Sequence, residues 1–141
     1  MKKLMISALA ILCFTGYALE ATAASYCSNA TLKGTYLYSG QGAQRGQIKA
    51  YLETGMETYD GMGKVVNMYS NSESLTTNHD TGTYVVNGNC SGTVKYSSGT
   101  VLTIFVNPTG GNFTYIQTNV GDKLLSGEEK RVSTKAILSV N

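Results

Sequence analysis

Residues 81–96 read TGTYVVNGNCSGTVKY, two runs of alternating apolar and polar residues on either side of an Asn-Gly step. Alternation with a period of two is typical of strands that bury one face, so this stretch predicts a β-hairpin. Asn87 and Gly88 both tolerate positive φ, which favours a tight reversal between the strands. The shared inward face of this hairpin is predicted to carry Tyr84, Val86, Val94 and Tyr96.

The same alternation recurs along the chain, whose 16 Gly and 1 Pro, with many Thr, Tyr and Val, favour strands and turns over helices. About eight short strands predict an all-β fold. We expect a small antiparallel up-and-down β-barrel, which leaves no open sheet edge, with a two-sheet β-sandwich as the alternative. Besides the hairpin, strands are predicted at residues 31–39, 47–54, 64–70, 100–106, 112–118, 120–127 and 131–140. The TVLTIFV run at residues 100–106 is apolar at both alternating positions and is expected to be covered on both faces.

The chain begins MKKLMISALAILCFTGYALEATAA, a basic start, an apolar run and a small-residue cleavage site. This pattern predicts a secretory signal peptide at residues 1–23, followed by a single domain at residues 24–141. No later stretch is long and apolar enough to span a bilayer, so we expect no stable membrane insertion of the mature chain. The mature protein is therefore predicted to be exported, either to the periplasm or out of the cell.

Beyond the leader the chain has two cysteines, Cys27 and Cys90, which lie 63 residues apart. In an exported domain this even pair is interpreted as one structural disulfide, which would stabilise the fold by about 4 kcal/mol in the chain-entropy model. A reactive thiol or a metal ligand is the alternative. His79 is the only histidine and the cysteines are isolated, so no metal is predicted.

The charge pattern argues against several functions. The chain has 11 Lys and Arg against 9 Asp and Glu, and no stretch concentrates the basic residues, so we predict no nucleic-acid partner. No nucleophile elbow or phosphate-binding loop is present, and we predict no catalytic residue and no cofactor. Glu53, Glu57 and Asp60 are considered as an acid–base group, but Glu53 alternates with Leu52 and is expected on a solvated rim. The charged run at residues 128–131 is interpreted as a solvated turn.

Four pieces of the sequence also occur in a recognisable order: CSNATLKGTYLYS, ETYDGMGKVV, TGTYVVNGNCSGTV and FTYIQTNVGDKLLSG. Together they span nearly the whole predicted mature chain, and they resemble exported bacterial proteins with a domain similar to the allene oxide cyclase barrel. That domain is an eight-stranded calycin-like fold. The resemblance implies a barrel and a disulfide, and it implies no catalytic residue because these bacterial domains are mostly uncharacterised.

The tyrosines suggest a function. Four of the ten tyrosines fall on predicted inward faces, and buried phenols that need hydrogen-bond partners can line a semi-polar pocket. The first hypothesis is therefore a binding protein for a small apolar or aromatic ligand. The alternative is that these side chains only fill the barrel. The candidate ligand-lining residues are Tyr36, Tyr38, Tyr84 and Tyr96.

Two other hypotheses stay open. The most polar stretch, residues 71–80, is predicted to be a loop, and it would be the contact element of an interaction module such as a protease or lysozyme inhibitor. The fold resemblance alone suggests an enzyme of the cyclase or isomerase kind, although fold is a poor guide to chemistry. The candidate interaction residues in the loop are Ser74, Asn78, His79 and Asp80.

Overall fold

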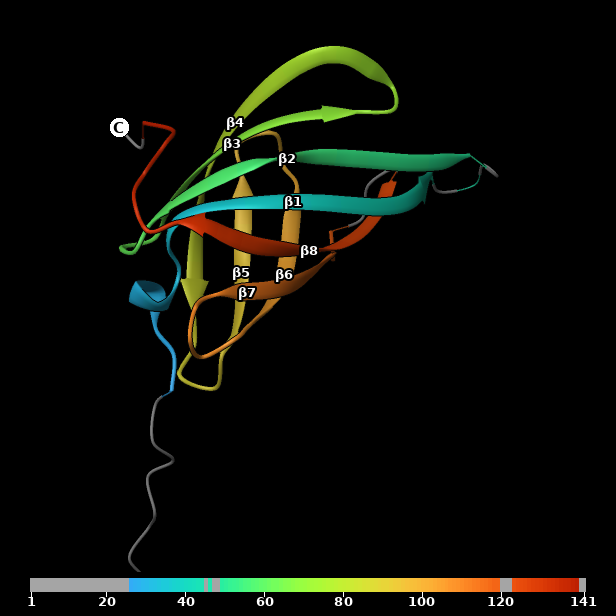
Figure 1. Cartoon of the computed structure of the whole chain (residues 1–141). Coiled ribbons are helices and arrows are strands. Elements are labelled where there is room, and N and C mark those ends of the chain that lie inside the picture. The colour runs from blue at the N-terminus through green and yellow to red at the C-terminus, as the bar shows by residue number, and fades with distance from the viewer. Residues whose placement is uncertain (1–25, 45, 47–48, 120–122, 140–141) are drawn as a thin grey trace, which may run out of the picture.

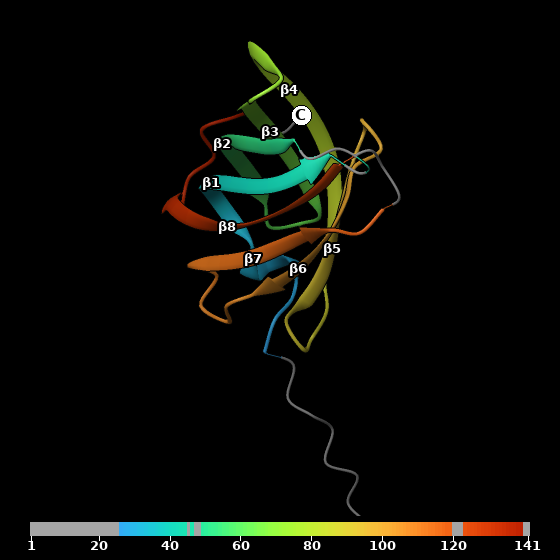
Figure 2. The same cartoon turned by 90° about the vertical axis from the view of Figure 1, so that its right-hand side faces the viewer.

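The computed structural model describes residues 26–44, 46, 49–119 and 123–139. Its eight strands form one closed antiparallel barrel, in which each strand pairs with the next and the last pairs with the first (Figure 1, Figure 2). The predicted barrel is confirmed and the sandwich alternative is wrong. The strands are β1 (Lys33–Gln44), β2 (Ala50–Asp60), β3 (Lys64–Asn71), β4 (Ser74–Val86), β5 (Ser91–Tyr96), β6 (Val101–Val106), β7 (Asn112–Gln117) and β8 (Lys123–Ser133).

The ends of the chain lie around this barrel. Residues 1–23, the predicted signal peptide, lie outside the described residues. Before β1 comes a single 3-10 turn, η1 (Asn29–Thr31), and no helix among the described residues is long and apolar enough to cross a membrane. After β8 the chain crosses the outside of β1 and β2, where Thr35 donates a hydrogen bond to the Lys135 carbonyl (2.9 Å) and Thr58 accepts one from the Leu138 amide (3.2 Å).

One end of the barrel is filled by aromatic and aliphatic side chains. The Tyr59 ring meets the rings of Tyr36, Tyr84 and Phe113 edge-on, with centroid distances of 5.0–5.7 Å. The chain segment before β1 covers this cluster and is held there by the disulfide between Cys27 and Cys90. The predicted disulfide is therefore confirmed, and we call this half of the barrel the closed end.

The hairpin of residues 81–96 has the predicted inward face, since Tyr84, Val86, Val94 and Tyr96 are all buried. Its turn differs from the expected two-residue reversal. The Asn87 amide donates to the Ser91 carbonyl (2.8 Å), and Cys90, not Asn87 or Gly88, has the positive φ of 67°. A four-residue turn thus places Cys90 next to the segment before β1, within reach of Cys27.

Three expectations about single strands are wrong. In β2 the alternation is inverted, because Leu52 is exposed while Tyr51, Glu57 and Tyr59 are buried. In β6 only one face is covered, since Leu102 and Ile104 are buried but Phe105 is 59% exposed. The last strand, β8, covers residues 123–133 instead of 131–140, so it includes the charged run that was expected to be a turn. Polar inward residues explain the first and third errors, because they reverse the usual pattern.

Residues 71–80 are not a loop. They form the turn and the first half of β4, which pairs with β3 in a hairpin that extends beyond the rest of the barrel (Figure 1). His79 lies opposite Met68 in this pairing. The polar composition of the stretch reflects strands with solvent on both sides.

Candidate functional site

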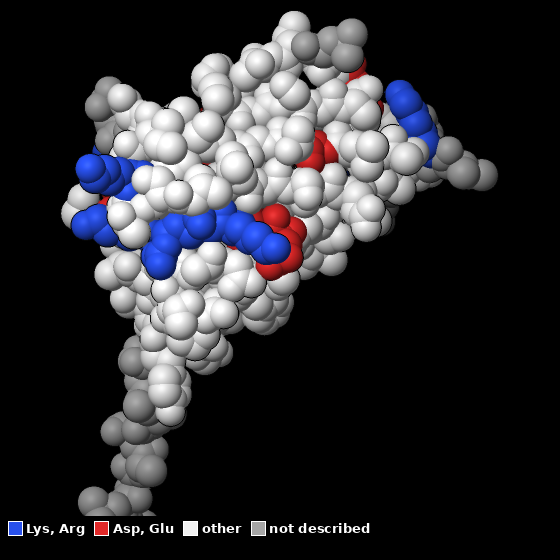
Figure 3. Space-filling model, viewed as in Figure 1, with Lys and Arg blue, Asp and Glu red and all other residues white. Residues whose placement is uncertain are grey.

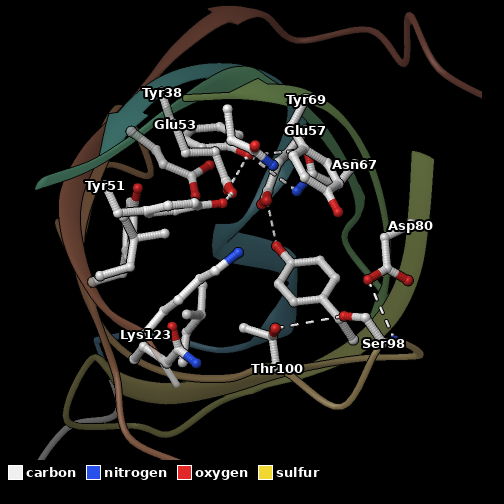
Figure 4. A pocket seen from close by; sticks show the side chains of 17 residues that line it. Tyr38, Tyr51, Glu53, Glu57, Asn67, Tyr69, Asp80, Ser98, Thr100 and Lys123 are labelled. Carbon is white, nitrogen blue, oxygen red and sulfur yellow. Dashed lines mark hydrogen bonds between the residues drawn. The ribbon is translucent and has the colours of Figure 1, made fainter. Parts of the chain in front are cut away.

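The half of the barrel away from the disulfide encloses a cavity of about 250 Å³. All eight strands contribute to its wall. Its residues come from the middle of β1 and β4, from most of the length of β2, β3 and β8, and from the ends of β5, β6 and β7 that lie toward the β5–β6 turn. We call this half the open end, and Figure 4 shows side chains that converge on the cavity from several strands.

Tyrosines form much of the cavity wall, and two of them are fixed by a carboxylate. The Tyr38 hydroxyl donates a hydrogen bond to Oε1 of Glu53 (2.9 Å) and accepts one from Nδ2 of Asn67 (3.2 Å). The Tyr51 hydroxyl donates to Oε2 of the same Glu53 (2.5 Å). Glu53 therefore points inward, and the expected solvated rim is wrong. The tyrosines of the wall are Tyr38, Tyr51, Tyr69, Tyr96 and Tyr115.

Deeper in the cavity, Glu57 is only 2% exposed. Both of its oxygens accept hydrogen bonds from phenols, Oε1 from Tyr96 and Oε2 from Tyr59. Burial raises the pKa of Glu57 to about 7, although these hydrogen bonds favour the ionised form and lower it. Burial also raises the pKa values of Tyr59 and Tyr96 well above the ordinary value of a tyrosine, so both hydroxyls remain protonated and can donate hydrogen bonds.

Glu129 of β8 faces the same region and has no exposed surface. The Tyr115 hydroxyl makes no hydrogen bond to a described residue. The oxygens of Glu129 accept none from a described N–H or phenol donor, and its side-chain hydrogen bond is with the carboxyl of Glu57. Burial, and then the charge of Glu57, raise the pKa of Glu129 well above its ordinary value. Burial thus favours the protonated form of two neighbouring carboxyl groups, an arrangement that can accept and release protons.

Two glycines make room for the Tyr115 side chain. Gly40 and Gly127 are opposite each other where β1 pairs with β8. A Cβ atom at Gly40 would lie 2.3 Å from the Tyr115 hydroxyl oxygen, and one at Gly127 would lie 2.6 Å from it. The missing side chains therefore let the phenol lie against the barrel wall with its hydroxyl beside the cavity.

Polar and charged residues surround the mouth of the cavity. Lys123 pairs with Glu73 of the β3–β4 turn, and its Nζ lies 4.4 Å from the centroid of the Tyr51 ring. Asp80 is held by hydrogen bonds from the Ser97 hydroxyl and the Thr81 amide. Figure 4 shows Lys123 and Asp80 on different sides of the cavity. On the face seen in Figure 3, most Lys and Arg side chains lie at one side and another lies at the opposite edge. The acidic residues that line the cavity are Glu53, Glu57, Asp80 and Glu129.

The four tyrosines predicted to line a pocket separate into two pairs. All four are buried, as expected. Tyr38 and Tyr96 do line the cavity. Tyr36 and Tyr84 belong to the closed end, where their hydroxyls donate to the carbonyls of Gly110 (2.7 Å) and Leu32 (2.8 Å), and they do not line it.

The four predicted interaction residues, Ser74, Asn78, His79 and Asp80, all lie in β4. Only Asp80 lines the cavity. The structure brings neither Ser74, Asn78 nor His79 to it, and their role in partner binding stays a prediction.

Neither Glu57 nor Glu129 is assigned to the site from the sequence, because Glu57 is considered with Glu53 and Asp60 as an acid–base group and set aside, and Glu129 is placed in a solvated turn. The available signal for Glu57 was that residues 51–59 alternate Tyr-x-Glu-x-Gly-x-Glu-x-Tyr, with large and polar residues at every second position. If the odd-numbered residues of this stretch are assigned to the inner face of the barrel, Tyr51, Glu57 and Tyr59 are buried, as the structure shows. Glu129 gave a weaker signal, because its neighbours Glu128 and Lys130 are charged and exposed.

No group of three or more His, Cys, Asp or Glu among the described residues is arranged to hold a metal ion. The cavity instead offers hydrogen-bond acceptors and aromatic rings to an organic molecule. Comparison with protein families, with characterised proteins and with solved structures finds no significant match. We therefore infer the function from the geometry of the cavity alone.

Proposed function

We propose that this protein is an exported binding protein that holds one compact aromatic molecule in the open end of the barrel. The observation that carries the proposal is the cavity itself, which has a wall of five tyrosines and a polar base, in a barrel whose other end holds a cluster of buried aromatic and aliphatic side chains. A volume of about 250 Å³ is just below the usual range of about 300–1,000 Å³ for ligand pockets, which suits a single ring with a short substituent.

The rigidity of the wall supports binding. Tyr38 and Tyr51 are fixed by Glu53, and Tyr96 is fixed by Glu57, so these rings need little reordering when a ligand enters. A preformed wall reduces the entropic cost of association. Aromatic faces favour flat ligands, which pack edge-to-face or offset against them. The buried carboxyl groups disfavour a ligand with no polar group, and we therefore narrow the expected ligand from apolar or aromatic to aromatic with a polar substituent.

Two further parts of the proposal come from the sequence. Export is supported by the predicted leader and by the disulfide, because such bonds persist mainly in oxidising compartments. Likeness to the allene oxide cyclase-like barrels is supported by the strand and turn motifs. Neither part adds a catalytic role, and the proposal does not depend on one.

Native mass spectrometry of the protein purified from its own host tests the binding function. We expect a native mass above the denatured mass by the weight of one small organic molecule. A bare native mass would count against a retained ligand.

Two variants on adjacent residues of β8 locate the molecule. Leu125 is buried and lines the cavity, whereas Leu124 is 54% exposed on the outside. A tryptophan at position 125 fills the cavity, so Leu125→Trp should lose the extra mass, and Leu124→Trp should keep it. Circular dichroism establishes that both variants are folded. Retention of the extra mass by a folded Leu125→Trp variant would place the ligand elsewhere.

A further inference from the structure

Among the described residues, the Tyr115 hydroxyl beside the cavity has no hydrogen-bond partner, and the oxygens of Glu129 accept no hydrogen bond from an N–H or phenol group and pair only with the Glu57 carboxyl. Glu129 has no exposed surface, and Tyr115 is 5% exposed. Buried polar groups are almost always hydrogen-bonded, and an unpaired one destabilises the fold. Both residues line the cavity.

The charges around the cavity favour a cation. Four acidic side chains line it, and Lys123, its one basic lining residue, is already paired with Glu73 outside. Glu53 and Glu57 each accept two phenol hydrogen bonds, whereas Glu129 accepts none. An anionic ligand would be repelled by this group. A cation would be attracted, and the tyrosine faces would add cation–π contacts.

The donor count narrows the class of cation. An ammonium group has three N–H donors and no acceptor, which complements two carboxylate oxygens and one hydroxyl oxygen. We propose that the cavity recognises a small aromatic primary amine, with the ammonium group at Glu129 and Tyr115 and the ring among the tyrosines of the wall. This inference rests on the proposed function and specifies its ligand class.

Binding an amine changes the protonation of the site. Burial beside Glu57 raises the pKa of Glu129 and favours its protonated form, whereas an ammonium next to it favours the ionised form. One proton is then released from Glu129 to the buffer for each amine bound. The titratable groups that act on or are acted on by Glu129 are Glu57, Tyr36, Tyr59, Tyr96 and Tyr115. The tyrosines all have raised pKa values and remain neutral, so the proton comes from the carboxyl pair.

Isothermal titration calorimetry with three probes of similar shape tests the ligand class. We expect 2-phenylethylamine to bind about ten-fold or more tightly than 2-phenylethanol, because charge-assisted hydrogen bonds to a buried carboxylate exceed neutral ones. 3-Phenylpropanoate should not bind. A released proton is taken up by the buffer and adds the buffer's protonation enthalpy to the measured heat. At pH 7 the heats of amine binding in phosphate and in Tris should therefore differ by the difference between the two protonation enthalpies, for about one proton. Equal binding of amine and alcohol, or no binding of the amine, would overturn the inference.

Neighbouring variants of β8 supply the matched control. Glu129→Gln keeps the shape of the side chain and removes its charge, so the amine should bind about ten-fold more weakly and release no proton. Glu128→Gln changes an exposed residue that accepts a hydrogen bond from Asn112, and it should bind the amine like the parent protein. Tyr115→Phe, which removes only the unpaired hydroxyl, should weaken amine binding less than Glu129→Gln does. Parent-like affinity and proton release in Glu129→Gln would overturn the assignment of the ammonium site.

The outcomes separate the two proposals. If native mass spectrometry finds a bound molecule that is neutral or acidic, the binding function stands and the amine class is wrong. If it finds no bound molecule and none of the three probes binds, both are wrong.

Discussion

Tyr36 and Tyr38 lie two residues apart on β1, point into the same barrel and are both buried, yet their environments differ completely. The Tyr36 hydroxyl donates to the backbone carbonyl of Gly110, and its ring packs against Tyr59 and Phe113. The Tyr38 hydroxyl donates to the Glu53 carboxylate, and its ring lines the cavity. β7 repeats the contrast, with Phe113 in the closed end and Tyr115 at the cavity.

The difference assigns stability to one end of the barrel and recognition to the other. In the closed end each buried tyrosine hydroxyl has a partner in the backbone or in Glu57, and the rings fill the space. In the open end, buried carboxyl groups and an unpaired phenol remain beside a cavity, and such groups destabilise a fold unless something else pairs with them. Variants should therefore affect stability or binding according to the end they occupy.

Removal of the disulfide should have the largest effect on stability. The double variant Cys27→Ala, Cys90→Ala removes the cross-link between two residues that lie 63 positions apart. Because the unfolded chain is then less restricted, the free energy of unfolding should fall by about 4 kcal/mol. Urea unfolding followed by circular dichroism measures this change. Ligand affinity should stay at its parent value below the unfolding transition. A variant that loses ligand affinity while it is still folded would contradict the division between the two ends.

Glu129→Gln should change the pH dependence of stability. The folded state holds the Glu129 proton to a higher pH than the unfolded state, whose pKa is about 4.3. Stability therefore falls as pH rises from about 4 toward the folded-state pKa, because the folded state binds more protons in that window. Without ligand, the Glu129→Gln variant should therefore lose less stability between pH 5 and pH 7 than the parent protein loses.

Urea unfolding at pH 5, 6 and 7 measures that difference, with Glu128→Gln as the control. The control should follow the parent protein because Glu128 is exposed. Identical slopes for Glu129→Gln and the parent protein would mean that Glu129 is ionised in the folded state.

Two glycine variants compare the space available at the two ends. A Cβ atom at Gly92, in the closed end, would lie 2.4 Å from the backbone oxygen of Val85 and 3.0 Å from Ile104. One at Gly40 would meet only side chains, Tyr115 and Leu125, which can move into the cavity. Overpacking typically destabilises by about 1–3 kcal/mol, so we expect about 3 kcal/mol for Gly92→Ala and about 1 kcal/mol for Gly40→Ala.

Thermal and urea unfolding rank the two glycine variants, and calorimetry completes the comparison. Gly40→Ala should weaken ligand binding because Tyr115 is displaced, whereas Gly92→Ala should not. The reverse order of stabilities would show that the open end has no room to adapt.

The fold was predictable from the sequence because its signals are local. Alternation in residues 81–96 depends only on neighbours in the chain, and the two cysteines of the predicted exported domain have only each other as partners, so both predictions could be made and are confirmed. The site was predictable only in part, as Tyr38 and Tyr96 illustrate. Alternation shows which residues point inward but does not show which end of the barrel they reach. Glu57 and Glu129 contradict the rule that charged residues face water, so any prediction based on that rule assigns them to the surface.

The smallest expected effect is the most direct test of the two ends, because it removes one oxygen atom from each. Tyr36→Phe deletes the donor to the buried Gly110 carbonyl and should lower the free energy of unfolding by about 1 kcal/mol. Tyr115→Phe deletes a hydroxyl without a partner among the described residues, and we expect a change within about 0.5 kcal/mol. The binding effects should be reversed, with weaker amine binding in Tyr115→Phe and unchanged binding in Tyr36→Phe. If the two variants lose equal stability in urea unfolding without ligand, the Tyr115 hydroxyl is paired in the free protein, and the ammonium must be bound by Glu129 alone.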